Sequence, residues 1–148
     1  MKKLLLVIEK SKNGKLWGRV KFDDDLIVDA AVSSDELEKK MKKLLQRFHQ
    51  VEPSEIKFEL AYDLTALFSQ KDFLNVSAIA LKAGISPGLM RQYVAGFKYP
   101  SSERAKAIEH IINSLGRELM KIKIVVVKNG PPSKSKSVKH KATTKNTA

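Results

Sequence analysis

The stretch LNVSAIALKAGISPGLMRQYVAGFKYPS, which runs from Leu74 to Ser101, carries the start and stop signals of two short helices in direct succession. Asn75 has a side chain preferred at an N-cap, and the apolar residues Leu74 and Ile79 are spaced around it as a hydrophobic staple. Gly84 follows at a position where a helix ends in a residue of positive φ. The pattern therefore predicts a first helix between Asn75 and Gly84.

A second helix is expected almost at once. Ser86 is its predicted N-cap, and Pro87 occupies the first helical position, where proline fits best. Gly96 ends this helix and Ser101 caps a third one. One face of the third helix carries the apolar residues Ala105, Ile108, Ile112, Leu115 and Leu119. Two capped helices that share a four-residue turn indicate a helix-turn-helix.

Helix pairs of this kind bind DNA by placing the second helix in the major groove, and capped helical hairpins also occur in modules that bind only proteins. A further short core helix is expected upstream, with Leu64, Leu67 and Phe68 as its apolar residues. The aromatic residues Phe68, Tyr93 and Phe97 are interpreted as core residues rather than as platforms on which bases stack.

The residues before this region predict a small sheet with one helix. Asn13-Gly14 is a strong hairpin signal between two strands, and a third strand, a capped helix and a fourth strand follow. The expected strands are Lys3–Glu9, Leu16–Phe22, Leu26–Val32 and Ile56–Leu60. Ser33 or Ser34 caps the helix, whose apolar stripe is Leu37, Met41, Leu44, Leu45 and Phe48. The order is β-β-β-α-β, and the fold class is α+β.

Length and charge divide the chain further. Its 148 residues with a net charge of +12 allow two small domains and favour a polyanionic partner. Six lysines and no acidic residue lie between Lys128 and Ala148, and this segment has too few apolar residues to fold. We expect domains at 1–61 and 62–127 and a disordered basic tail at 128–148. The tail is interpreted either as a non-specific attraction for nucleic acid or as a solubilising or artificial end.

Several function classes are excluded by composition. The chain has no cysteine and three histidines, so disulfides, thiol catalysis and a zinc cage are not expected, and no cofactor is expected either. No apolar run approaches the ~20 residues of a membrane helix. The motifs of nucleophile elbows and P-loops are missing, so an enzyme is not expected. Trp17 and Phe22 lie an odd number of residues apart, on opposite faces of a strand, which argues against an RNA-stacking platform.

A family resemblance adds to this interpretation. Residues Leu74 to Leu115 resemble the DNA-binding domain of phage-repressor (XRE-type) regulators. The order of elements from Met1 to Val127 resembles the HicB-type antitoxins, which join a partial double-stranded-RNA-binding-like domain to a helix-turn-helix. In the first domain this likeness rests on the hairpin and on Phe22-Asp23, followed by Ser34-Asp35-Glu36 ahead of the helix.

The resemblance implies a cytoplasmic antitoxin of a type II toxin-antitoxin system. Such a protein neutralises a small, basic, mRNA-cleaving HicA-like toxin through its first domain. It represses its own operon through the second domain, which binds double-stranded DNA at the operator. A solitary XRE-type transcriptional regulator without a toxin partner is the alternative.

The resemblance also assigns DNA contacts to the second helix of the pair and to the loop after it. The expected contact residues are Ser86, Pro87, Gly88, Leu89, Arg91, Gln92, Lys98 and Tyr99. Arg91 and Gln92 have the donors that read guanine and adenine, whereas Lys98 and Tyr99 hold the DNA backbone. Ser86 and the N–H groups beside it suit a phosphate, and Leu89 suits a thymine methyl.

Two predictions concern protein partners. Asp23, Asp24, Asp25 and Asp29 form an expected acidic surface for a basic toxin; as a Ca²⁺ site the triple Asp lacks the spaced ligands of an EF-hand. The segment Ile122–Val127 is an expected strand that pairs with a partner chain in a dimer or with a sheet of its own chain. A dimer presents two helices to half-sites ~34–36 Å apart, so a palindromic operator is expected.

Overall fold

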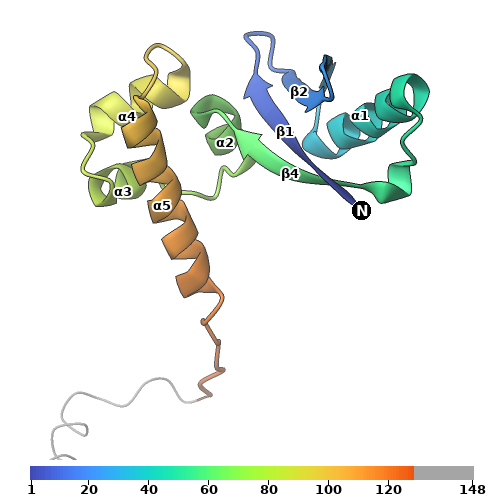
Figure 1. Cartoon of the computed structure of the whole chain (residues 1–148). Helices are drawn as coiled ribbons and strands as arrows, with labels where there is room; N and C mark the ends of the chain where they lie inside the picture. Colours follow the sequence, from blue (N-terminus) through green and yellow to red (C-terminus); the bar gives the residue numbers. More distant parts are fainter. Residues whose placement is uncertain (129–148) are drawn as a thin grey trace, which may run out of the picture. The chain divides into compact units, whose positions relative to one another are not determined.

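The computed structural model describes residues 1–128 as an α+β fold with a four-stranded mixed sheet and five α-helices (Figure 1). Met1–Ser114 form one compact unit, and the described residues from Leu115 onward belong to a second. The expected division of the first unit after residue 61 stays a prediction. The expected basic tail lies, apart from Lys128, outside the described residues.

The sheet has the order β3-β2-β1-β4. Its strands are β1 (Lys2–Lys10), β2 (Leu16–Phe22), β3 (Asp25–Ala31) and β4 (Ile56–Tyr62). The β1–β2 hairpin forms where Asn13-Gly14 predicted it, with Gly14 at φ 85°. β3 pairs antiparallel with β2, whereas β4 pairs parallel with β1. The parallel pair requires a crossover, which α1 (Ser34–His49) and a short 3₁₀ turn (Pro53–Glu55) supply.

Helix α1 buries one face of this sheet. Ser33 is its N-cap, as expected, because its hydroxyl accepts a hydrogen bond from the Glu36 N–H at 3.2 Å. The core on this face contains Leu37 and Met41 of α1 with Leu6, Ile8, Leu16, Val20 and Ala31 of the strands. Phe48, expected on the same stripe, is 60 % exposed. The prediction fails there because Phe48 lies on the last turn of α1, where the Arg47 guanidinium covers its ring instead.

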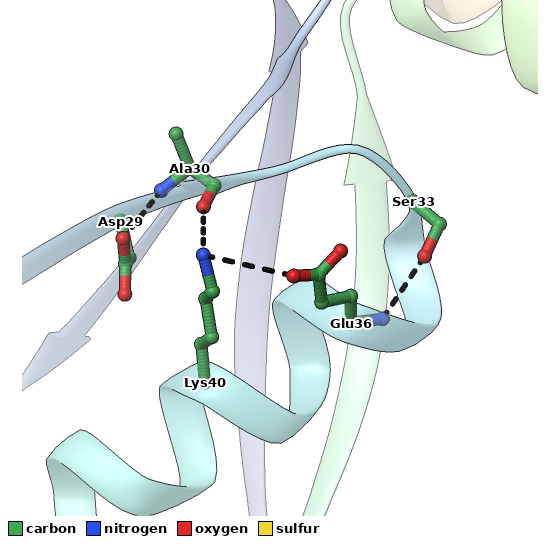
Figure 2. A network of polar contacts seen from close by, with 5 residues as sticks. All are labelled: Asp29, Ala30, Ser33, Glu36 and Lys40. Carbon is green, nitrogen blue, oxygen red and sulfur yellow. Dashed lines mark hydrogen bonds and ion pairs between the residues drawn. The ribbon is translucent and has the colours of Figure 1, made fainter.

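A small polar network fastens α1 to the end of β3 (Figure 2). The Lys40 ammonium donates to the Ala30 carbonyl at 2.8 Å and lies 3.8 Å from the Glu36 carboxylate. Asp29 accepts the N–H of Ala30 at 2.7 Å on the strand itself. Because Lys40 is held by a backbone oxygen as well as by a carboxylate, it orients the helix rather than projecting into solvent.

The remaining helices are α2 (Leu64–Gln70), α3 (Val76–Lys82), α4 (Pro87–Ala95) and α5 (Ser102–Leu119). Asp63 caps α2 by accepting from the Ala66 N–H at 2.8 Å. Ala66 is buried in the core of the sheet, and the Lys10 ammonium of β1 donates to the Ser69 hydroxyl at 2.8 Å. Helix α2 is therefore the element that joins the sheet to the helices that follow.

The expected C-terminal strand is absent from the described part of the chain. Residues 122–127 after α5 have no strand pairing. Their apolar side chains are between 56 and 93 % exposed. The prediction of pairing with the chain's own sheet is wrong for this structure. An extended segment becomes a strand only when it pairs with a neighbouring edge, and among the described residues no strand of the same chain pairs with it.

Candidate nucleic-acid interface

The two helices α3 and α4 begin and end as their sequence predicted. The Asn75 side chain accepts from the Ala78 N–H at 3.0 Å, and Ser86 accepts from the Leu89 N–H at 3.2 Å. Gly84 lies between the helices at φ 72° and Gly96 ends α4 at φ 81°. The four residues of the turn, 83–86, are therefore held by caps on both sides.

The inner face of the pair is closely packed. Ile79, Ala80, Ile85, Met90 and Tyr93 are all buried. The Tyr93 hydroxyl accepts a hydrogen bond from the Arg104 guanidinium at 2.8 Å, which joins α4 to the first turns of α5. Ser101 caps α5 through the Arg104 N–H, as its sequence predicted. These contacts fix the rotation of α4 about its own axis, so the same residues always face outward.

The outer face of α4 carries the predicted base readers. Gly88, Arg91 and Gln92 are exposed, whereas Pro87 and Leu89 are half-buried. Leu89 therefore presents only part of its side chain to a ligand. A Cβ atom at Gly88 would meet only the Arg91 guanidinium, at 3.8 Å, so the surface beside Arg91 is open.

The loop after α4 is exposed and partly aromatic. Lys98 and Tyr99 are exposed as expected, Tyr99 to 85 %. Phe97 is 81 % exposed, so its assignment to the core is wrong, whereas Phe68 and Tyr93 are buried as predicted. The reason is local: Gly96 ends the helix, and the N–H groups of Phe97 and Lys98 return to the Gln92 carbonyl, which turns the Phe97 side chain outward.

The charge of this region has one sign. Between Leu74 and Ser101 there are three basic residues, Lys82, Arg91 and Lys98, and no Asp or Glu. In the first turn of α4, Pro87 has no N–H and the Leu89 N–H is bonded to Ser86, so the Gly88 N–H is the one that adds partial positive charge there. Among the described residues, Arg91 and Lys98 have no carboxylate partner. Both cations are thus free to pair with an anionic ligand.

The four aspartates of the expected acidic surface are not gathered in one place. Asp23 and Asp24 form the β2–β3 turn, and the Asp25 carboxylate lies 3.2 Å from Nε2 of His49. Asp29 lies four residues further along β3, roughly 13 Å away at the rise of a strand. Its carboxylate already accepts the N–H of Ala30. The structure therefore groups Asp23, Asp24 and Asp25 and separates Asp29 from them.

Two features of the sheet were not anticipated from the sequence. The face opposite α1 is uncovered and carries large apolar side chains, with Leu5 52 %, Trp17 45 % and Val28 47 % exposed. The signal was present in the unbroken apolar run Leu4–Ile8, because a strand covered on one face only alternates with polar residues. The second feature is a groove of about 500 Å³ along β4, lined also by α2 and α5.

No family model, curated protein or solved structure is significantly similar to this chain. In residues 1–128, no three His, Asp or Glu side chains lie close enough to hold a metal ion. Over the same residues, no helix has the length and apolarity of a membrane span.

Proposed function

We propose that the chain is a DNA-binding repressor of its own operon and the antitoxin of a toxin-antitoxin pair. One observation carries the DNA-binding part: two capped helices separated by four residues hold the outer face of α4 open, and that face is basic with no acidic residue near it in sequence. This is the arrangement of phage-repressor-like helix-turn-helix domains, in which the second helix enters the major groove.

Each outward residue has a role in this proposal. Arg91 and Gln92 are the residues that reach base edges, because an Arg fork fits guanine and a Gln amide fits adenine. Lys98 and Tyr99 contact phosphates from the loop and set the register of the helix. The Ser86 hydroxyl and the Gly88 N–H at the start of α4 donate to a further phosphate, and half-buried Leu89 contacts a thymine methyl.

Binding to promoter DNA tests these roles. Fluorescence anisotropy compares a duplex from the chain's own promoter with a scrambled duplex of equal length. We expect Arg91→Ala and Gln92→Ala each to lose ~1–3 kcal/mol on the promoter and little on the scrambled duplex. Lys98→Ala should weaken both, and Lys57→Ala, the same charge change on β4, should alter neither. Equal losses on both duplexes for Arg91→Ala would make it a phosphate contact instead of a base reader.

The antitoxin part is supported by the first 62 residues. The order β-β-β-α-β is the one expected for a partial double-stranded-RNA-binding-like domain, and the open sheet face supplies an apolar surface for a partner. The carboxylates at the β2–β3 turn supply charge complementary to a small basic ribonuclease toxin. No catalytic role is assigned to any residue of this chain.

Purification of the tagged chain from its native cells tests the partner. A small basic protein together with promoter DNA supports the antitoxin, whereas promoter DNA alone supports the second candidate, a solitary XRE-type regulator. Because Asp29 lies apart from the other aspartates, two variants are compared. Asp23→Asn with Asp24→Asn should weaken toxin binding, and Asp29→Asn should not; unchanged binding in both would remove the acidic turn from the interface.

A further inference from the structure

The outer edge of β4 is an unused strand edge. β4 is the last strand of the sheet and forms its ladder with β1 alone. In the described part of the chain no other backbone group pairs with residues 56–62 from the outer side. A strand edge of this kind is a template for a further strand.

The groove of about 500 Å³ lies along this edge. Leu60, Ala61 and Tyr62 of β4 form one wall, and Ile108 and Ile112 of α5 contribute to the other. Its lining is mostly aliphatic and aromatic, with the carboxyl groups of Glu59, Asp63 and Glu109 and the ammonium groups of Lys98 and Lys106 among it. A ligand for this groove must therefore be extended, apolar in its middle and able to accept both signs of charge at its ends.

The chain itself contains such a segment. Residues Lys121–Lys128 read KIKIVVVK, with a continuous run of β-branched residues from Ile124 to Val127. Ile124 is 93 % exposed and Val126 is 86 % exposed. β-Branched residues are those that favour strands, and a run of them left in water is an aggregation hazard unless it is paired.

We infer that the segment Ile122–Val127 of a second copy of this chain adds to the outer edge of β4 as a fifth strand. Strand addition supplies main-chain hydrogen bonds to the free edge, and alternate side chains of the segment enter the groove. Lys121, Lys123 and Lys128 of the segment are complementary to the groove carboxylates Glu59, Asp63 and Glu109. This surface gives the proposed dimer its interface.

The exposure of the segment identifies the occupant as a second copy. Helix α5 ends at Leu119 and is followed by a turn at Met120-Lys121, which the Ile122 N–H closes by donating to the Leu119 carbonyl at 3.2 Å. Beyond this turn the segment has no strand pairing within its own chain, and Ile124, Val125 and Val126 are 78–93 % exposed. An exposed segment and a free strand edge on the same chain satisfy each other when two copies each give a segment to the other.

Disulfide trapping tests the pairing, since the chain has no cysteine of its own. One variant carries Ala61→Cys on β4 and another carries Val125→Cys in the segment; they are purified separately, mixed and oxidised. The matched control pairs Val125→Cys with Ala30→Cys, on the same sheet face at the opposite edge strand β3. We expect the Ala61–Val125 disulfide to exceed the control by at least about tenfold, because docking raises the local thiol concentration.

Three outcomes would overturn the inference. They are equal yields for both pairs, a dominant Val125–Val125 disulfide, and a disulfide that closes within one chain in the double variant at dilution. A second measurement does not need cysteine: Val125→Pro, which removes a ladder donor, should dissociate the dimer in sedimentation, whereas Val125→Thr should keep it. Val125 is 78 % exposed, so unfolding of the single chain should not change.

This experiment is separable from the proposed function. Binding of the Val125→Pro chain to a duplex with a single half-site tests α4 alone. Retained half-site binding with a lost dimer supports both proposals. Half-site binding that is missing both from the Val125→Pro chain and from the unmodified dimer refutes DNA recognition by α4 and leaves the strand addition standing.

Discussion

Gly88→Ala separates the stability of α4 from its fit to DNA. Gly88 is the second residue of α4, is exposed and does not have a positive φ. An added Cβ would meet only the Arg91 guanidinium at 3.8 Å, an ordinary contact. Nothing in the free protein therefore opposes the methyl group, and the substitution acts through helix propensity alone.

Gly88→Ala is expected to raise the stability of the fold and to lower the affinity for promoter DNA. Alanine in place of glycine stabilises a helix by about 0.5–1 kcal/mol, which raises Tm by about 1–4 °C for a chain of this size. If α4 enters the major groove as proposed, the methyl group projects where the backbone of α4 approaches the base edges. We expect it to remove roughly what one base contact contributes, ~1–3 kcal/mol, or about 5- to 150-fold in Kd.

Thermal unfolding and promoter anisotropy are measured on the same preparations. Gly116→Ala is the matched control, because Gly116 lies on the exposed side of α5 with no atom within 4 Å of its added Cβ. It should raise Tm similarly and leave Kd unchanged. If Gly88→Ala raises Tm and binds the promoter like the unmodified chain, α4 does not enter the groove by its first turn, and the assignment of Gly88 and Arg91 to the DNA surface is refuted.

Three further predictions concern the sheet and the tail. Gly18→Ala should destabilise the fold by ~1–3 kcal/mol in denaturant titrations, because its Cβ would lie 2.6 Å from Leu37 Cδ2 in the core; unchanged stability would mean that α1 shifts freely. Burial and then the Glu38 carboxylate raise the pKa of Tyr62 above 10.0, so stability is full below pH 10 and falls as pH rises through the folded-state pKa; Tyr62→Phe should remove this loss in alkaline unfolding curves. Removal of Lys128–Ala148, which carries six lysines, should flatten the dependence of DNA affinity on salt, and an unchanged slope would exclude contact between the tail and DNA.

The caps show which features a sequence can predict. Asn75, Ser86 and Ser101 each bond to an N–H three residues away, so every atom involved lies within one short window. Gly84 and Gly96 have a positive φ, a conformation that depends on the glycine itself and on no distant contact. Local interactions of this kind are contained in the local sequence, and they fix the ends of α3 and α4 without knowledge of the rest of the chain.

The errors have a different origin. Phe97 and Phe48 are aromatic residues at the ends of helices, where periodicity no longer indicates which side faces the core. The segment 122–127 has the composition of a strand, yet a strand also needs an edge to pair with, and composition does not supply one. The grouping of Asp23 with Asp25 and the separation of Asp29 depend likewise on where β3 begins and ends. The missing strand therefore concerns a partner distant in sequence, whereas the errors at Phe48 and Phe97 arise at helix ends, where the periodic pattern stops.

Helix α4 has only two side chains proposed to contact base edges, so the proposed DNA recognition depends on the proposed dimer. Arg91 and Gln92 together supply ~2–6 kcal/mol of discrimination if both pair well with bases. Specific DNA binding generally exceeds non-specific binding by ~4–10 kcal/mol, so one copy of α4 falls short of most of that range. Two copies on adjacent half-sites double the discrimination to ~4–12 kcal/mol, which covers it. Under the proposed function, specific repression by this helix requires a dimer, and Val125→Pro should reduce discrimination between promoter and scrambled duplex by about half on the free-energy scale. A monomeric variant that discriminates as well as the dimer would show that α4 carries more base contacts than its two donors supply.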